Sequence, residues 1–257
     1  MWWLTSYRLD LKSQASYRLD FAIQIAIWMV YASLPLVAVG VLVSKFPNSG
    51  MSVAEVALVY CAVQLGYEGS RMFGRALDDF HTETSKGNLD RLLIHPKPLL
   101  PLVVASRIFP RRIAGIAAGL MGGAMGLTGT SQPTTALVML LIATASSVLI
   151  FSGLLTIYAA ICFWTITRNL FADIVTGSLV TLSLAPIENF AWPLRMLVTH
   201  LIPIYPGIQR PIRSLSSSGG AINLVDFFFP IAAGAGFYAV SVAMFYVGRR
   251  VYQSPGS

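Results

Sequence analysis

Long apolar runs alternate with short polar segments along most of the chain. A helix that crosses a bilayer needs about 20 mainly apolar residues, and runs of this length predict six spanning helices. The predicted spans cover residues 21–43, 53–73, 108–127, a stretch within 134–164, 170–187 and 225–247. The fourth run is longer than a bilayer requires, so we expect that helix to tilt or to protrude.

Residues 190–208 form a seventh candidate, but several prolines interrupt this stretch and Arg195 and His200 lie within it. A proline inside a helix costs about 3 kcal/mol, and an arginine at the centre of a bilayer costs about 2.5–3.5 kcal/mol on insertion scales. We therefore interpret residues 188–224 as an outer segment that contains short re-entrant or interfacial helices.

The distribution of basic residues sets the orientation of these spans. With an even number of spans, both termini lie on one side of the membrane, and that side holds 14 of the 18 basic residues. These are Arg8, Lys12, Arg18, Arg71, Arg75, Lys86, Arg91, Lys97, Arg107, Arg111, Arg112, Arg168, Arg249 and Arg250. The other side holds Lys45, Arg195, Arg210 and Arg213. The positive-inside rule therefore places both termini in the cytoplasm.

Composition agrees with a membrane protein. Hydrophobic residues make up 55% of the chain and charged residues only 11%, whereas about 25% of residues are charged in soluble domains. The net charge of +7 therefore reports topology first, and we expect no nucleic-acid partner. Cys61 and Cys162 lie inside apolar runs and are interpreted as small buried hydrophobic residues rather than as a disulfide.

The N-terminal segment, residues 1–20, has no apolar region before a small-residue cleavage site, so we expect no cleavable signal peptide. Trp2, Trp3 and Tyr7 are interspersed with charged residues. This pattern predicts an amphipathic helix that lies on the cytoplasmic surface of the bilayer.

The loop at residues 74–101 is the one sizeable cytoplasmic loop and contains a predicted short helix. Asn88 is a favourable N-cap, Asp90 suits the positive end of the helix dipole, and Pro96 disfavours helical geometry at His95. The apolar face of this helix is formed by Leu89, Leu92 and Leu93, and the polar positions are Asp90, Arg91 and His95. Because so short a helix is marginal in water, this leucine face needs a surface. Lipid headgroups, the protein's own spans and a partner all remain open.

Four segments, in order, carry a family resemblance. GNLDRLLIHPKPL, residues 87–99, resembles the G-x-L-D-x-L-L-x-x-P loop of the small branch of ABC-2 family transporter permeases. FWTITRNLF at 163–171, the segment 192–203 and the tail YQSPGS at 252–257 are similar to further segments of that branch. The chain departs from the pattern at His95, where Arg is more usual, and at Ala191, where a Tyr-Pro-rich run is more usual.

The resemblance implies an all-α permease of the ABC-2, type V exporter-like kind, forming a single transmembrane domain over residues 1–257. It implies a cytoplasmic coupling helix that docks on a separate ATPase subunit. The ATPase-coupling residues would be Asn88, Leu89, Asp90, Arg91, Leu92, Leu93 and His95. A second permease chain, identical or paralogous, would complete the transporter in the bacterial inner membrane. The cargo would be amphiphilic or hydrophobic compounds such as drugs, toxins or lipids.

The sequence contains no G-x-x-x-x-G-K-[ST] phosphate loop, so the chain itself cannot hydrolyse ATP by that mechanism. We therefore expect no cofactor on this chain, with ATP and Mg²⁺ held by the partner ATPase. No zinc-type spacing of Cys and His is present either, and the three histidines are scattered, so no metal site is predicted.

An enzymatic alternative rests on Asp78, Asp79 and Glu83. Carboxylates on a helix at the cytoplasmic face can hold Mg²⁺ against a diphosphate, as in intramembrane prenyl- or phosphatidyl-transferases. The more conservative interpretation is a solvated loop whose acids offset Arg75 and Lys86. A secondary transporter or channel is a further alternative, although ionisable residues lie deep in few of the spans.

Glu68, Arg71 and Arg75 recur on one helix face near the inner end of the second span. One interpretation is a Glu68–Arg71 ion pair with Arg75 reaching to the surface, and the other is the inner mouth of a transport path. In the third span, Gly115, Gly119 and Gly123 follow the small-x-x-x-small pattern that favours close helix packing.

Overall fold

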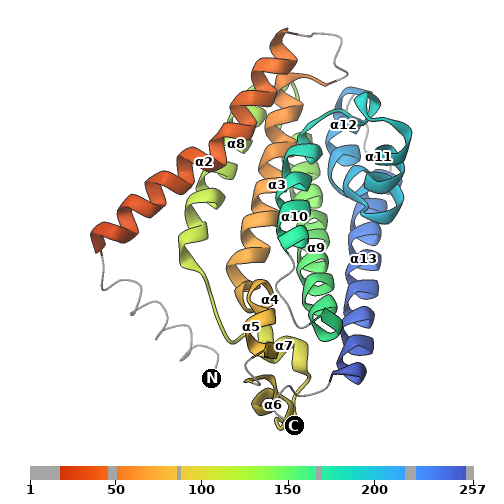
Figure 1. Cartoon of the computed structure of the whole chain (residues 1–257). Helices are drawn as coiled ribbons and strands as arrows, with labels where there is room; N and C mark the ends of the chain where they lie inside the picture. Colours follow the sequence, from red (N-terminus) through yellow and green to blue (C-terminus); the bar gives the residue numbers. More distant parts are fainter. Residues whose placement is uncertain (1–17, 46–50, 86–87, 166–169, 218–223, 253–257) are drawn as a thin grey trace.

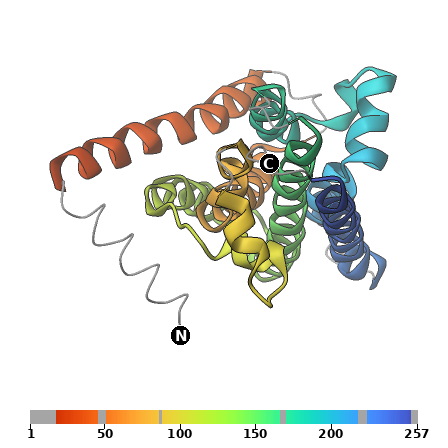
Figure 2. The same ribbon diagram turned by 60° about the horizontal axis from the view of Figure 1, so that its bottom comes forward.

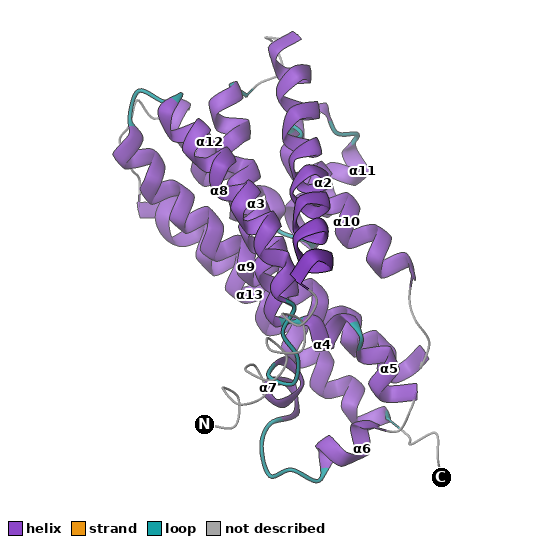
Figure 3. Ribbon diagram, turned by 90° about the vertical axis from the view of Figure 1, so that its left-hand side faces the viewer, coloured by secondary structure: helices purple, strands orange, loops and turns teal. Residues whose placement is uncertain are grey.

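The computed structural model describes residues 18–45, 51–85, 88–165, 170–217 and 224–252. Every regular element within these ranges is helical (Figure 3). The predicted all-α class is therefore confirmed. Residues 1–17 of the predicted N-terminal surface helix and the residues after Tyr252 in the C-terminal motif lie outside the described residues, whereas residues 18–20 form the start of the first long helix.

Each predicted span overlaps one helix, although the third helix begins at Ile113 rather than Ile108 and the fifth ends at Leu184 rather than Ile187. These helices are α2 (Arg18–Lys45), α3 (Val53–Phe73), α8 (Ile113–Thr128), α9 (Pro133–Thr165), α10 (Leu170–Leu184) and α13 (Leu224–Val251). The helix α3 has the predicted bounds because Ser52 and Glu55 form a reciprocal capping box at its start and Gly74 caps its end.

Judged by length and composition alone, two helices in the described part of the chain are long and apolar enough to cross a membrane. They are α9, with a mean hydropathy of 2.3, and α13, with a mean hydropathy of 1.7. The helix α2 contains a shorter apolar stretch, Ile23–Ala38. At about 1.5 Å per residue, the 33 residues of α9 measure about 50 Å, so it exceeds the bilayer core as expected from the sequence.

The long helices form a bundle in which α9 packs between α3 and α13 (Figure 1). The helix α8 covers the other side of α3, and α2 lies outside α8 and α3, inclined to both (Figure 1, Figure 2). Glycines on α8 permit its close approach to α3. A Cβ atom at Gly123 would lie 2.6 Å from Cys61 Sγ, and one at Gly119 would lie 3.1 Å from Gln64 Cβ.

Short helices gather at the two ends of the bundle (Figure 1). One end has α4 (Arg75–Asp78), α5 (Phe80–Ser85), α6 (Asn88–Leu93), α7 (Leu99–Val104) and η1 (Pro110–Arg112). The opposite end has η2 (Ile187–Asn189), α11 (Trp192–Met196), η3 (Leu197–Leu201), η4 (Tyr205–Gln209) and α12 (Arg210–Ser217). The prolines that exclude a seventh long helix thus break this second segment into short turns, and both η3 and η4 are π-helical.

Candidate functional site

The leucine face of α6 is covered by the protein itself. The side chain of Leu89 has an exposed fraction of 0% and belongs to a buried cluster that includes Phe80, Leu99 and Phe245. Leu92 and Leu93 pack against the same cluster. Of the surfaces left open by the sequence, the chain's own helices therefore cover the leucine face. The helix begins at Asn88, so Asn88 is its first residue rather than the residue before it.

The exposed part of this loop is the turn that follows α6. Residues 94–98 are all exposed, and 83% of the surface of Ile94 is accessible. His95 and Lys97 follow Ile94, and the backbone N–H of His95 donates to the carbonyl of Leu92 at 3.3 Å. We name residues 94–98 the loop tip. It combines an exposed aliphatic side chain with basic and prolyl residues. The helix α6, which the loop tip follows, lies at the far end of the bundle (Figure 3).

An aromatic cluster joins this loop to two long helices. Phe80 of α5 lies 5.2 Å from Phe163 of α9 and 5.6 Å from Phe245 of α13, measured between ring centroids. Phe163 and Phe245 are 5.1 Å apart, and Tyr252 lies 6.0 Å from Phe163. Aromatic pairs at such distances are each worth about 0.5–1.5 kcal/mol beyond the area they bury. A displacement of α5 and α6 must therefore move α9 and α13 or break this cluster.

Arginines neutralise the acidic residues between α3 and α5. Asp78 Oδ1 lies 3.4 Å from Arg71 Nη2, and Asp79 Oδ2 lies 3.0 Å from Arg75 Nε and 3.8 Å from Arg107 Nη1. The predicted offset of Arg75 by an acid is therefore found, whereas Lys86 and the side chain of Glu83 lie outside the described residues. No group of three or more candidate metal ligands occurs in the part of the chain that the structure describes.

The ion partner of Glu68 is Arg112, so the predicted pair with Arg71 is wrong. Glu68 Oε2 accepts a hydrogen bond from Arg112 Nη1 at 3.0 Å, and the two side chains are only 3% and 6% exposed. The guanidinium of Arg112 also lies 4.6 Å from the ring of Trp28 on α2. Arg112 occupies this position because η1 leads into α8, which packs tightly along α3.

Arg71 points instead toward the loop. It pairs with Asp78 and donates to Thr176 Oγ1 of α10 at 3.2 Å. Arg75 likewise pairs with Asp79 and lies over the ring of Phe109, rather than reaching freely to the surface. These contacts tie the C-terminal end of α3 to the middle of α10 and to the loop at residues 74–101.

A small cavity of about 150 Å³ lies between α2, α3 and α10, next to the buried ion pair. Its lining includes Gln64, Glu68 and Tyr67. The interpretation of Glu68, Arg71 and Arg75 as the inner mouth of a transport path stays a prediction. The structure places one of the three, Glu68, on a cavity wall.

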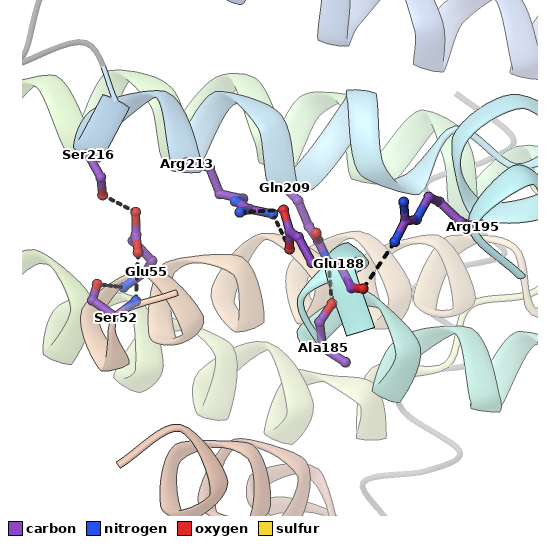
Figure 4. A network of polar contacts seen from close by, with 8 residues as sticks. All are labelled: Ser52, Glu55, Ala185, Glu188, Arg195, Gln209, Arg213 and Ser216. Carbon is purple, nitrogen blue, oxygen red and sulfur yellow. Dashed lines mark hydrogen bonds and ion pairs between the residues drawn. The ribbon is translucent and has the colours of Figure 1, made fainter. Parts of the chain in front are cut away.

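A second polar network holds the outer segment to the bundle (Figure 4). Glu188 receives two hydrogen-bonded contacts from Arg213, with Nη2–Oε1 at 2.7 Å and Nη1–Oε2 at 3.0 Å. Glu55, at the start of α3, accepts a hydrogen bond from Ser216 of α12. Gln209 Nε2 donates to the carbonyls of Ser183 and Ala185 at 2.7 and 2.8 Å.

The electrostatics of Glu188 follow from these contacts. Partial burial raises the pKa of this carboxyl, but the hydrogen bond from Arg213 and the charges of Arg213 and Arg195 outweigh burial and lower the pKa below its ordinary value. Glu188 is therefore ionised at neutral pH and fixes α12 against η2.

Several of these residues were not singled out by the sequence. Arg112 is 44 residues from Glu68 along the chain, so no local spacing indicates that pair. Ile94 lies between the polar positions of the loop, and its exposure depends on how α6 is seated. The capping box of Ser52 and Glu55 was visible as an S-x-x-E pattern, but its link to Ser216 was not.

These features together define an all-α membrane protein that carries a structured loop, residues 74–112, at one end of the bundle and a segmented cap, residues 187–217, at the other. A family model described as "ABC-2 family transporter protein" matches residues 27–256. The chain therefore belongs to the ABC-2 family of transporter proteins, as its sequence motifs indicated. Neither a curated protein nor a solved structure matches it. Membership identifies a membrane permease, in a family that is generally not itself catalytic, and implies association with ABC ATPase subunits.

Proposed function

We propose that the protein is the permease subunit of an ATP-driven exporter, with α2, α3, α8, α9, α10 and α13 each crossing the bacterial inner membrane and both termini in the cytoplasm. Hydropathy of α9 and α13 and the distribution of basic residues support this arrangement. The helices α8 and α10 have 16 and 15 residues. These lengths correspond to about 22–24 Å, which local thinning of the bilayer can accommodate.

The proposal rests on one observation: the loop tip is exposed, whereas the leucine face of α6, which precedes the tip, is buried in the protein. Leu89 anchors α6 in the protein, while Ile94 extends away from it. A partner that engages the tip therefore acts on a rigid element rather than on a free loop. We assign the ATPase contact to residues 94–98 together with the polar positions of α6, and we assign the leucine face to the transmission of force.

The aromatic cluster supplies the path of that force. When the ATPase subunits bind ATP and close, the loop tip moves with them, and Phe80 transfers the displacement to Phe163 of α9 and Phe245 of α13. The ATP and Mg²⁺ belong to the partner, and this chain contributes positioning and transmission. A second permease chain, identical or paralogous, completes the path for amphiphilic or hydrophobic cargo.

The Mg²⁺-dependent transferase is the less favoured alternative. Asp78 and Asp79 each lie within 4 Å of at least one arginine. A carboxylate that already pairs with a guanidinium offers less charge to a hard cation such as Mg²⁺. A secondary transporter or channel is disfavoured because Glu68, the deeply buried carboxylate of α3, is compensated by Arg112.

The test uses inside-out vesicles that contain the permease and its ATPase. We expect ATP-dependent accumulation of a lipophilic fluorescent dye, and we expect Phe80→Ala to abolish it while the ATPase still binds. Phe73→Ala is the matched control, because Phe73 is exposed at the end of α3 and lies outside the aromatic cluster. Accumulation that proceeds without ATP or without the ATPase would contradict the exporter assignment.

A further inference from the structure

A polar cavity of about 490 Å³ lies where α3, η4, α12 and α13 meet, at the end of the bundle opposite α6 (Figure 1). All of its lining residues are polar. They comprise two carboxylates, Glu55 and Asp226, two guanidiniums, Arg210 and Arg213, one tyrosine and two serines. Pockets that bind small ligands measure about 300–1,000 Å³ and are mostly apolar. A cavity of this size with a wholly polar lining is therefore suited to a small polar occupant.

Arg210 and Asp226 have hydrogen-bonding capacity left in this cavity. Arg210 Nε lies 3.3 Å from Asp226 Oδ1, and the guanidinium also lies 5.0 Å from the ring of Phe229, so both contacts fix its position. Among the described residues, however, Arg210 Nη1 and Nη2 have no acceptor and Asp226 Oδ2 has no donor. None of these three atoms is shut off from solvent. Unused N–H donors therefore lie beside an unused carboxylate oxygen.

The charges of the cavity favour a ligand that carries both signs. Two carboxylates and two guanidiniums give the lining a charge sum of zero. An anion bound at Arg210 would lie close to the Asp226 carboxylate, and a cation bound at Asp226 would lie close to the Arg210 guanidinium, so either is repelled by one member of the pair. A zwitterion that lies antiparallel to this pair forms charge-assisted hydrogen bonds with both members.

We propose that the cavity binds a small water-soluble zwitterion of the amino-acid type, in which an ammonium group stands next to a carboxylate. The carboxylate of the ligand accepts from Arg210 Nη1 and Nη2, and its ammonium donates to Asp226 Oδ2. A phospholipid headgroup fits less well, because no apolar side chain lines the cavity and could hold an acyl chain. The bound zwitterion joins α12 to α13, and this role goes beyond the export assignment and does not depend on it.

The test is saturation-transfer NMR on the full chain, purified in mild detergent and mixed with an equimolar set of the common L-amino acids. We expect at least one amino acid to receive saturation from the protein and to show a saturable titration. Three further probes separate the two charges: n-butylamine carries only the cation, butyrate only the anion, and glycerol neither. Each of them is expected to bind at least about tenfold more weakly, because each lacks a charge-assisted hydrogen bond.

Two variants remove the two halves of the site. Arg210→Gln removes the donors to the ligand carboxylate, and Asp226→Asn keeps the side-chain shape but removes the charge that the ammonium needs. Each is expected to lower the affinity for the amino acid about tenfold to a hundredfold. Arg195→Gln is the matched control, because Arg195 is an exposed arginine at the same end of the bundle that does not line the cavity. This variant is expected to bind like the wild type.

Thermal unfolding of each variant separates loss of the ligand from loss of the fold. Three results would overturn the proposal. The first is a wild-type chain that binds none of the amino acids, which would leave only solvent in the cavity. The second is a glycerol, n-butylamine or butyrate probe that binds as tightly as the amino acid. The third is an equal loss of affinity in Arg195→Gln and Arg210→Gln, which would assign binding to the general charge of this surface.

Discussion

Two aliphatic residues of the loop at residues 74–101, five positions apart, are expected to respond to truncation in opposite ways. Leu89 is fully buried against the aromatic cluster, whereas Ile94 is 83% exposed at the loop tip. Leu89→Ala removes buried methyl groups and leaves a cavity, which costs about 2–5 kcal/mol. Ile94→Ala removes no internal contact of comparable size, so its effect on stability stays within about 0.5 kcal/mol.

The effects of the two substitutions on ATPase binding are expected to follow the opposite order to their effects on stability. If Ile94 becomes buried when the ATPase docks, its side chain contributes about 1.5–3 kcal/mol to the complex. Because 1.4 kcal/mol corresponds to a factor of ten, Ile94→Ala weakens ATPase binding by about tenfold or more. In Leu89→Ala the tip remains chemically intact, so the primary defect is a lower unfolding temperature.

The assay measures both quantities on the same detergent-purified chains. Thermal unfolding reports stability, and titration with purified ATPase reports affinity. The reasoning is refuted if Ile94→Ala lowers the unfolding temperature as much as Leu89→Ala does, or if Ile94→Ala binds the ATPase with unchanged affinity.

Three further outcomes are expected. Glu68→Gln leaves Arg112 buried without its counter-charge and destabilises the protein by about 3–5 kcal/mol. Chemical denaturation measures this loss, and an unchanged denaturation midpoint would contradict the pairing of Glu68 with Arg112. Gly123→Ala forces α8 from α3 at a cost of about 1–3 kcal/mol, while Gly69→Ala has room for its Cβ and is neutral or stabilising in the same thermal assay. The lowered pKa of Glu188 stabilises the outer segment fully above the ordinary value of 4.5, and this contribution is lost as the pH falls further through the lowered folded-state pKa. The protection factors of the α12 amides, referred to the intrinsic exchange rate at each pH, should therefore fall on acidification below that value in the wild type but not in Glu188→Gln.

The local sequence pattern was sufficient to predict where the helices lie. It was insufficient to predict which surfaces those helices contact. The bounds of α3 follow from an apolar run with a capping box at one end and a glycine at the other, and these signals lie within the segment itself. The helix α6 was likewise predictable from the spacing of its leucines. Which surface covers those leucines depends on contacts with Phe245, which is remote along the chain, so the sequence left it open.

The same limit explains the wrong ion pair. The i, i+3 rule favours Glu68 with Arg71 because adjacent turns of a helix bring such residues together. The tight packing of α8 on α3 places the buried Arg112 next to Glu68, and Arg71 pairs with Asp78 instead. Spacing rules compare possible ion partners within one helix. They contain no information on charged residues that a neighbouring element places beside that helix.

Site-specific photo-crosslinking from the loop tip identifies the subunit that binds this loop. A photoreactive amino acid is placed at position 94 in the full chain, in cells that also express its ATPase, and the crosslinked product is identified by peptide sequencing. We expect a product with a subunit that contains G-x-x-x-x-G-K-[ST], and no such product from the same label at position 240, which is exposed on α13 at a distance from the loop. A tip label that yields no product with that subunit, or a label at position 240 that yields it equally, would contradict the assignment of the loop tip to the ATPase.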